Sequence, residues 1–475
     1  MSNKMLQFVD TERDMPKKRA AETRREDFAE IYGDYIHAKA EEQASRCSQC
    51  GVPFCQNHCP LENNIPDWLK LTAEGRLEDA YRISAATNSM PEICGRICPQ
   101  DRLCEGSCVI EQSGHGTVTI GSVERYLTDT AWQEGWVEPI APRQERELSV
   151  GIIGAGPAGL AAAESLRQQG WQVTVYDRHD RAGGLLIYGI PNFKLEKAIV
   201  ERRTQRLIDG GITFVLNTDI GTDISFDKLR ERHAAILIAT GVYKARDLDC
   251  PGAGADGVTA ALPFLIESNK RGLGDTVDSE TAKDKTVVVI GGGDTAMDCV
   301  RTAVRQGAKS VTCLYRRDRS NMPGSARETA NAEEEGVAFN WLAAPKAIHD
   351  DGGSVSLVRA DRMRLGAMDA SGRESVDAVD GADFDVKADL VIKALGFSPE
   401  NMGDLSADLT LTRWGTVKAN PVSFETNIEG VYAAGDIVRG ASLVVWAIRE
   451  GRDAADHMHA YLKTLETAKT LEAAE

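Results

Sequence analysis

The sequence lacks the features that would place the protein in or across a membrane. No apolar run approaches the ~18 residues that a transmembrane helix needs, and the first residues, MSNKMLQFVDTERD, contain no hydrophobic core of a secretory signal. We therefore expect a cytoplasmic protein. Positive charge is also scarce, because 72 acidic residues outnumber 55 basic ones and the net charge is -17. This balance argues against nucleic acid as a partner and fits a solvated surface.

The chain is too long for one ordinary domain, since it has 475 residues. Its first part is charged and helix-like and ends in a stretch rich in proline and charge, WQEGWVEPIAPRQERE, which is typical of a linker. Short β-branched runs then alternate with helical stretches, which predicts doubly wound α/β domains. Between about 346 and 393 an antiparallel insertion is expected from the turn pairs Asp351-Gly352, Ser371-Gly372 and Asp380-Gly381.

Two glycine loops each follow a strand and open a helix. In the first, Asp177 ends the next strand, VTVYD, at the spacing of a dinucleotide site. Glycines at this spacing permit a tight turn and let a pyrophosphate reach a helix N-terminus, while the acid accepts a hydrogen bond from a ribose hydroxyl. The loop after the strand LSVGII consists of Gly154, Ala155, Gly156, Pro157, Ala158 and Gly159.

The second loop follows the strand TVVVI and favours a different nucleotide. The next strand, SVTCLYRR, places Arg316 and Arg317 where an acid would otherwise select a free ribose 2′-hydroxyl. Arginines can bind a 2′-phosphate through charge-assisted hydrogen bonds, so NADPH is favoured over NADH. This loop consists of Gly291, Gly292, Gly293, Asp294, Thr295 and Ala296.

Two later segments suggest what the first loop binds. The strand-like runs LIATG at 237–241 and GVYAAGD at 430–436 resemble motifs of flavoproteins with two dinucleotide-binding domains. In those flavoproteins the final aspartate, here Asp436, holds the ribityl chain of FAD, and the NADPH domain is inserted within the FAD domain. The resemblance therefore implies that the first loop is the FAD site.

Cysteine is concentrated in one short region. Of eleven cysteines, eight fall between Cys47 and Cys108. Because disulfides are disfavoured in a chain without an export signal, this density predicts a metal or metal–sulfur site. Unligated buried cysteine is a reasonable reading for any one of the eight, but not for all of them.

The spacing of these cysteines favours iron–sulfur clusters over zinc. Only one C-x-x-C pair occurs, whereas structural zinc usually draws on closely paired thiols, and a Cys-Pro step that ends a run is typical of bacterial ferredoxins. We therefore expect two 4Fe-4S clusters. Three pairs have i,i+4 spacing, which on a helix would place both thiols on one face and let one helix reach two clusters: Cys55/Cys59, Cys94/Cys98 and Cys104/Cys108.

Together these motifs resemble the small (beta) subunits of bacterial NADPH-dependent glutamate synthases. The resemblance covers nearly the whole chain and rests on the cysteine runs and on GAGPAGL at 154–160, GGLLIYGIP at 183–191, GGGDTAMD at 291–298, YRR at 315–317 and VYAAGD at 431–436. The same module forms the electron-input half of dihydropyrimidine dehydrogenase. The resemblance implies a helical cluster domain over 1–145, an FAD domain over 146–251 and 397–475, and an inserted NADPH domain over 252–396.

The resemblance also implies site residues. One cluster would be held by Cys47, Cys50, Cys55 and Cys108, and the other by Cys59, Cys98, Cys104 and Glu124, with Cys94 as an alternative ligand. The FAD residues would be Gly154, Gly156, Pro157, Ala158, Gly159, Asp177, Arg178, Gly184, Leu185, Gly189, Thr240, Gly241, Gly435 and Asp436. The NADPH residues would be those of the second loop, Gly291 to Ala296, with Arg316, Arg317 and Arg327.

The implied chemistry is electron transfer toward a second chain. Hydride from NADPH would pass to FAD, and electrons would pass singly through the clusters. The chain begins Met-Ser and so lacks the N-terminal cysteine nucleophile of the family's glutaminase domain. An FMN-containing large subunit would therefore make two glutamates from glutamine and 2-oxoglutarate, giving a hetero-oligomer. The alternatives are the flavoprotein subunit of an NADPH:ferredoxin oxidoreductase or transhydrogenase, a zinc-stapled binding module, and a purely structural subunit.

Overall fold

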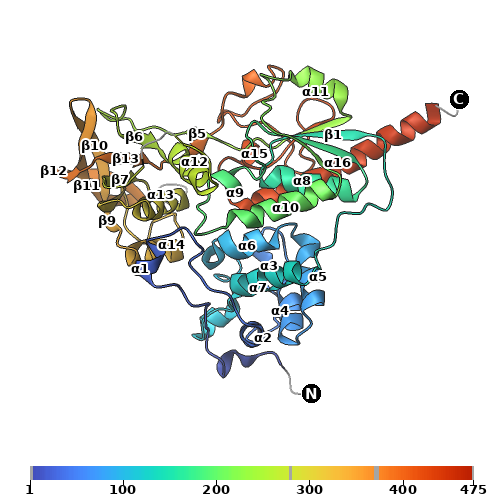
Figure 1. The fold of residues 1–475 in the computed structure, drawn as a ribbon, viewed down its shortest axis with the longest axis horizontal. Coiled ribbons are helices and arrows are strands. Elements are labelled where there is room, and N and C mark those ends of the chain that lie inside the picture. Colours follow the sequence, from blue (N-terminus) through green and yellow to red (C-terminus); the bar gives the residue numbers. More distant parts are fainter. Residues whose placement is uncertain (1–3, 278–280, 369–373, 473–475) are drawn as a thin grey trace.

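The computed structural model describes residues 4–277, 281–368 and 374–472. Figure 1 shows a helical N-terminal domain below two α/β domains. The first α/β domain, which includes β1 and the C-terminal helix α16, lies at the right of the view, and the second lies at the left. The α/β prediction with a helical N-terminal domain is confirmed. Within the described residues, no helix has the length and apolar character of a membrane span.

The N-terminal domain is built from short helices whose apolar faces meet. In α4, Ile65, Trp68 and Leu69 are spaced to lie on one helix face and are all buried, while Pro66 occupies the first turn, where its missing N–H costs nothing. The helices are α1 (Ala21–Arg24), α2 (His37–Ser45), α3 (Phe54–Asn57), α4 (Ile65–Ala73), α5 (Leu77–Thr87), α6 (Pro91–Ile97) and α7 (Ile120–Gln133), with 3-10 turns at Gln7–Val9, Gln100–Arg102 and Val109–Ser113.

The first α/β domain contains a parallel sheet in the order β15-β4-β1-β2-β3. Its central strands are almost continuously apolar because helices cover both faces. The strands are β1 (Ser149–Ile153), β2 (Gln172–Tyr176), β3 (Thr213–Val215), β4 (Ala235–Ile238) and β15 (Val431–Ala433). The helices are α8 (Pro157–Gln168), α9 (Leu185–Tyr188), α10 (Lys197–Asp209), α11 (Phe226–Arg232), α15 (Asp436–Arg439) and α16 (Val444–Glu472).

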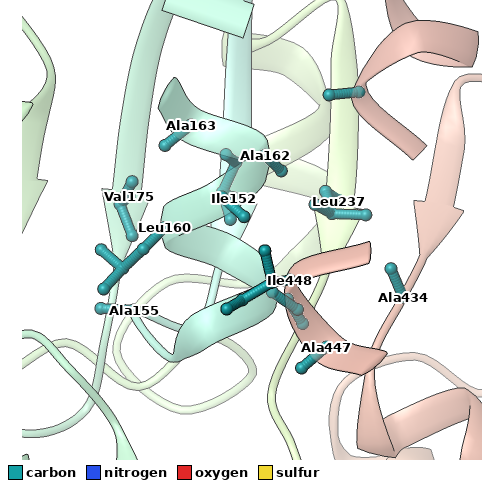
Figure 2. Close-up of a cluster of buried hydrophobic side chains, with 14 of the residues drawn as sticks. Ile152, Ala155, Leu160, Ala162, Ala163, Val175, Leu237, Ala434, Ala447 and Ile448 are labelled. Atoms are coloured by element: carbon teal, nitrogen blue, oxygen red, sulfur yellow. The ribbon is translucent and has the colours of Figure 1, made fainter. Parts of the chain in front are cut away.

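The core of this domain joins its first and last segments. Figure 2 shows α8 beside β1, with Leu160 and Ala162 packed near Ile152, while Ile448 of α16 closes the same cluster. The small side chains of α8 let α16 approach closely: a Cβ on Gly451 would lie 2.2 Å from the Ala158 carbonyl oxygen. The C-terminal helix thus completes a fold that begins about 300 residues earlier.

The second α/β domain lies between β4 and β15, so the chain leaves the first sheet and returns to it. Its parallel sheet has the order β6-β13-β7-β8-β9, and the short antiparallel pair β5 (Lys244–Ala245) and β14 (Phe397–Ser398) joins the two crossings. The predicted insertion is confirmed. The sheet strands are β6 (Val258–Ala260), β7 (Thr286–Ile290), β8 (Ser310–Tyr315), β9 (Ala338–Trp341) and β13 (Leu390–Lys393), and the helices are α12 (Ala261–Gly272), α13 (Asp294–Arg305) and α14 (Ala326–Glu334).

An antiparallel sheet of three strands extends from this domain, as the turn pairs predict. It contains β10 (Ala343–Asp351), β11 (Ser354–Met368) and β12 (Glu374–Lys387). The Asp351-Gly352 turn joins β10 to β11, and Ser371-Gly372 lies outside the described residues. The predicted turn at Asp380-Gly381 is wrong: these residues form an irregularity within β12, where Gly381 has φ +71°. Extra residues that bulge out of a ladder use the same turn-type residues as a chain reversal.

Candidate functional site

The first glycine loop has the shape of a pyrophosphate cradle. Gly154 has φ +108°, and a Cβ there would lie 2.4 Å from the Ala239 carbonyl oxygen. A Cβ on Gly159 would lie 2.0 Å from the Gly154 oxygen, whereas a Cβ on Gly156 meets nothing within 4 Å. Gly154 and Gly159 therefore allow close packing against neighbouring backbone. Gly156 instead faces open space at the N-terminus of α8, where free N–H groups favour an anion.

A cavity of about 300 Å³ opens beside this loop. Its size is at the lower end of the range for ligand sites. The Thr240 side-chain oxygen is buried and has no hydrogen-bond partner among the described residues, which fits a site that a polar ligand completes. Five residues predicted to bind FAD line this cavity: Gly154, Asp177, Arg178, Thr240 and Gly241.

Asp177 follows β2 directly and is organised by its neighbours. Its carboxylate accepts hydrogen bonds from the Ala155 N–H at 2.7 Å and from the His179 backbone and ring nitrogens at 2.8 and 3.0 Å. Burial opposes ionisation of the carboxyl, but these hydrogen bonds hold the pKa of Asp177 below its ordinary value. The carboxylate therefore remains an acceptor fixed at the cavity wall, with acceptor capacity left for a ribose hydroxyl.

The other residues predicted for FAD lie around the loop. Gly184 precedes α9 with φ +53°, and a Cβ there would lie 2.8 Å from the Gly156 Cα, so the two glycines pack together. Leu185 begins α9, which Gly189 follows, and Pro157 and Ala158 open α8. Gly435 and Asp436 follow β15 at the same edge of the sheet, outside the lining of the 300 Å³ cavity. Burial raises the pKa of Asp436 to about 6.

Sequence reasoning missed most of the lining of this cavity, including Tyr243, Glu400 and His179. Tyr243 and Glu400 both contact Arg178: the guanidinium lies 4.9 Å from the Tyr243 ring centre and pairs with the Glu400 carboxylate at 2.9 Å. His179 holds Asp177. No local pattern marks Tyr243 or Glu400, and Glu400 enters only after the chain has returned from the inserted domain. A His two positions after the strand-end acid was the one available signal.

The second glycine loop repeats the geometry of the first. Gly291 has φ +144°, and a Cβ there would lie 2.2 Å from the Ala394 carbonyl oxygen. Gly292 packs against the Tyr315 ring, while a Cβ on Gly293 meets nothing within 4 Å. Ala296 is fully buried within α13, where its methyl group replaces the third glycine. The open side of this loop is thus again at a helix N-terminus.

The polar residues predicted for NADPH differ in their surroundings. Asp294 accepts a hydrogen bond from the Ser325 N–H at 2.9 Å and so fixes the start of α14 beside the loop, and Thr295 lies in the first turn of α13. Arg316 is exposed just after β8, whereas the Arg317 Nε donates to the Glu374 carbonyl oxygen at 3.0 Å. The two arginines are therefore not equivalent. Arg327 lies over the ring of Tyr32 in the N-terminal region, at 5.9 Å.

The eight clustered cysteines surround two separate cavities. One is lined by Cys47, Cys50, Cys55 and Cys108, and the other by Cys59, Cys94, Cys98, Cys104 and Glu124. Burial raises the pKa of Cys55 to about 12 and those of Cys47 and Cys59 to about 11. Metal coordination would hold such thiols as thiolates. Within the described residues, no three His, Cys, Asp or Glu side chains converge on a point suited to a single metal ion.

The three i,i+4 cysteine pairs differ in their local structure. Cys55 lies in α3 and Cys59 follows it, and the two reach different cavities. Cys94 in α6 and Cys98 at its end share one cavity. Cys104 and Cys108 do not lie on a helix, because hydrogen-bonded turns connect them, so the one-face geometry of a helix does not apply to this pair. Cysteines that bind a metal site can be presented by turns as well as by helices, so the i,i+4 spacing does not require a helix.

Glu124 and Cys94 both face the second cavity. Glu124 lies in α7, and its Oε1 is 3.4 Å from the Asn88 amide nitrogen and 3.5 Å from the Ser84 hydroxyl. Burial raises the pKa of Glu124 to about 8. Cys94 is buried, and its thiol is 3.8 Å from the Asn88 side-chain oxygen. Either side chain is placed to complete a set with the three remaining cysteines.

The second cavity borders the first α/β domain. Val445 of α16 lines it, and Cys94 and Cys98 belong to the same apolar cluster as the core of that domain. Beside this contact, Glu92 of α6 and Arg203 of α10 form a buried two-contact ion pair, with N–O distances of 2.7 and 2.9 Å. The second cavity therefore lies between this domain and the N-terminal helices.

Comparisons with known proteins agree with this organisation. Residues 24–136 match the family described as dihydropyrimidine dehydrogenase domain II, 4Fe-4S cluster, and residues 148–451 match the pyridine nucleotide-disulphide oxidoreductase family. Among solved structures, FprA of Mycobacterium tuberculosis in complex with NADPH has a TM-score of 0.57 at 20% identity, covering 68% of this chain and 86% of FprA. At this identity the likeness shows the fold alone.

Relatives of closer sequence span the whole chain. The glutamate synthase [NADPH] small chain of Azospirillum brasilense is 62% identical over 100% of both chains. That of Escherichia coli K12 is 47% identical over 98% of this chain and 100% of the relative. A putative oxidoreductase of E. coli K12, AegA, is 46% identical over 93% of this chain and 68% of its own length. The chain thus belongs to the family of NADPH-dependent glutamate synthase small chains, oxidoreductases with an N-terminal 4Fe-4S domain.

Proposed function

We propose that this chain is the NADPH-oxidising subunit of a glutamate synthase. It would take hydride from NADPH onto FAD and deliver electrons through two 4Fe-4S clusters to an FMN-containing large subunit, which makes two L-glutamate from L-glutamine and 2-oxoglutarate. The observation that carries this proposal is the combination of two open glycine cradles with two cysteine-lined cavities in one chain. We further propose that the protein works in the cytoplasm as part of a hetero-oligomer.

We assign the first cradle to FAD and the second to NADPH. The open faces of Gly156 and Gly293 leave room for a pyrophosphate at the N-termini of α8 and α13. The side chain of Thr240, which is buried without a partner among the described residues, would bond to FAD. Arg316 and Arg317 would bind the 2′-phosphate of NADPH as a charge-assisted pair. The remaining FAD and NADPH residues keep the assignments predicted from the sequence.

We assign one cluster to each cysteine cavity. Cys47, Cys50, Cys55 and Cys108 would hold the first, and Cys59, Cys98 and Cys104 would hold the second, together with Glu124 or Cys94. Bound FAD would supply the exchange between two-electron hydride chemistry and one-electron transfer. Because the second cavity is the one that Val445 of the FAD domain lines, electrons would enter the N-terminal domain there.

A cysteine substitution at the first cavity tests this function. Cys50→Ala should remove one cluster, because Cys50 lines that cavity, while NADPH still bleaches the flavin under anaerobic conditions. Dye reduction by the flavin should persist, and glutamate formation with the large subunit should stop. Since metal binding and folding are coupled, retained FAD and soluble expression must be verified first. Glutamate formation at the parent rate in a folded variant that lacks this cluster would refute the electron path.

A second candidate function has one supporting observation. AegA, a putative oxidoreductase, matches nearly this whole chain yet is longer, so the same module occurs within a different protein. The alternative is an NADPH:ferredoxin oxidoreductase or transhydrogenase subunit with another acceptor. Co-purification of the native protein decides between them, because a bound FMN-containing large chain supports glutamate synthesis and a different acceptor protein supports the alternative.

A further inference from the structure

Residues 17–33 of the N-terminal region form a closed loop that we call the strap. The Arg19 N–H donates to the Ile31 carbonyl oxygen at 2.9 Å and the Gly33 N–H donates to the Lys17 carbonyl oxygen at 3.0 Å, so the two arms of the strap are joined. Its short helix is α1. Figure 1 shows α1 beside α14, at the lower side of the NADPH domain in this view, toward the N-terminal helices.

One arm of the strap grips the NADPH domain through charge. The Arg24 side chain is only 1% exposed, and it donates to the Glu334 carboxylate at 2.7 Å and lies 3.5 Å from that of Glu335. Lys18 also pairs with Glu334 and donates to the Asn331 side-chain oxygen at 3.3 Å. These partners all lie at the end of α14 or directly after it. A buried guanidinium is costly when its carboxylate partners are removed, so this contact favours one placement of the strap on α14.

The other arm binds the remaining two domains. The Phe28 carbonyl oxygen accepts from the Asn192 amide at 2.9 Å, in the loop that precedes α10 of the FAD domain. Glu30 pairs with Arg96 of α6 at 2.8 Å and with Arg125 of α7 at 3.0 Å, and both helices belong to the cluster domain. A single loop of the chain therefore touches all three domains where they meet.

The contacts of the strap with α14 are linked to the NADPH glycine loop through one further helix, α13. Glu335 also accepts from Arg301 and Arg305 of α13, at 2.9 and 2.6 Å, and both guanidinium groups lie over the Phe193 ring of the FAD domain, at 4.5 and 3.9 Å. The helix α13 begins directly at Gly293. The strap and the FAD domain thus both contact the charged cluster of Glu335, Arg301 and Arg305. Two of these residues belong to α13, the helix whose N-terminus would bind the NADPH pyrophosphate.

We propose that the strap is a positioning element that holds the NADPH domain in the orientation required for hydride transfer to FAD. The inference rests on the proposed NADPH-to-FAD step. Hydride transfer requires close approach of the reacting atoms, and a displacement of about 1 Å can lower a rate by roughly 100-fold. Arg24 and Lys18 contact neither glycine loop, so they would act through α14 and α13 and not on NADPH directly.

The test compares strap variants with a matched control. In Arg24→Ala and in Lys18→Ala with Arg24→Ala, stopped-flow reduction of FAD by NADPH should slow by at least about ten-fold, while NADPH affinity changes less than about two-fold, since the glycine loop is untouched. Arg24→Lys should restore part of the rate. The control is Arg359→Ala, which removes an exposed ion pair with Asp385 in the same domain and should leave the rate unchanged.

A second readout does not depend on activity. Hydrogen exchange of the α14 amides should become faster in the strap variants, because the helix loses its fixed contacts, and it should stay at the parent value in the control. Parent rates in a variant with loosened α14, unchanged exchange in Arg24→Ala, or a loss confined to NADPH affinity would each overturn the proposal. Lys18→Ala, whose side chain is 33% exposed, serves if Arg24→Ala does not fold. Failure of NADPH to reduce FAD in the parent protein would instead refute the proposed function.

Discussion

A valine at position 156 should abolish FAD binding and leave the apoprotein intact. The substitution is specific because Gly156 has φ -81° and ψ -176°, which any residue adopts, and because a Cβ there meets nothing within 4 Å. The new side chain therefore occupies only the space that we assign to the pyrophosphate. The apoprotein should keep its free energy of unfolding within about 0.5 kcal/mol of the parent apoprotein.

The size of the effect follows from ligand linkage. A ligand present at about 100 to 1,000 times its Kd stabilises the folded state by ~2.7 to 4.1 kcal/mol. For an FAD domain of this size, the parent holoprotein should melt roughly 5–15 °C above the Gly156→Val protein, and removal of FAD from the parent should close that gap. Differential scanning calorimetry with and without added FAD measures both quantities, and flavin absorbance gives the stoichiometry.

Gly159, in the same loop, provides the contrast. In Gly159→Ala the new methyl group would lie 2.0 Å from the Gly154 carbonyl oxygen, so helix α8 must shift from β1, and the apoprotein itself should lose on the order of 1–3 kcal/mol. Stoichiometric FAD in Gly156→Val would show that the pyrophosphate lies elsewhere. A low melting temperature of its apoprotein would show that the space beside Gly156 is needed by the fold.

Three further predictions concern the other sites. Replacing Arg316 and Arg317 together with Ala should weaken NADPH use by about 1.5–3 kcal/mol for each charged hydrogen bond lost, and kcat/KM for NADH should hardly change; equal loss with both coenzymes would contradict the assignment. Glu124→Ala should alter the electron paramagnetic resonance spectrum of one cluster more than Cys94→Ala does if the carboxylate is the ligand, and the reverse order would identify the thiol. Glu92→Gln should destabilise the joint between the FAD and cluster domains by about 1.5–3 kcal/mol, because the buried Arg203 loses its charged hydrogen-bond partner and keeps the more distant Glu164 at 3.7 Å, and thermal unfolding with unchanged melting would refute this.

The sequence predicts best where structure is local. A strand, a glycine loop and a helix follow one another directly, so the sequence marks Gly154 and Gly291 as turn glycines, and both have positive φ in the fold. The fold class could be predicted for the same reason, since each strand is marked by its own apolar run, whereas the insertion of the NADPH domain was implied only by the resemblance of residues 237–241 and 430–436 to flavoprotein motifs. The domain boundaries and the individual ligands remain predictions.

The features that sequence reasoning missed depend on distant contacts or on the context of a turn signal. Asp380-Gly381 looks like a hairpin turn, yet the strand opposite continues and converts it into a bulge within β12. Glu400 reaches Arg178 only after more than 200 intervening residues. Arg24, read from the sequence, is one charge in a polar run, whereas in the fold it is almost completely buried. A local pattern carries no signal for a partner that another domain supplies.

Several ion pairs with buried partners lie at the joints between domains, and their positions bear on electron transfer. Glu92 with Arg203 joins the cluster and FAD domains, Lys194 with Asp298 joins the FAD and NADPH domains at 2.8 Å, and Arg24 joins the strap to α14. Desolvation makes such pairs poor sources of stability compared with apolar packing, but a partner shifted out of place leaves a buried charge unpaired. Apolar surfaces allow one domain to slide over another at little cost, whereas these pairs permit one arrangement. Since hydride transfer depends on a fixed approach of the reacting atoms, we infer that the charged joints keep the cofactor sites at constant separation.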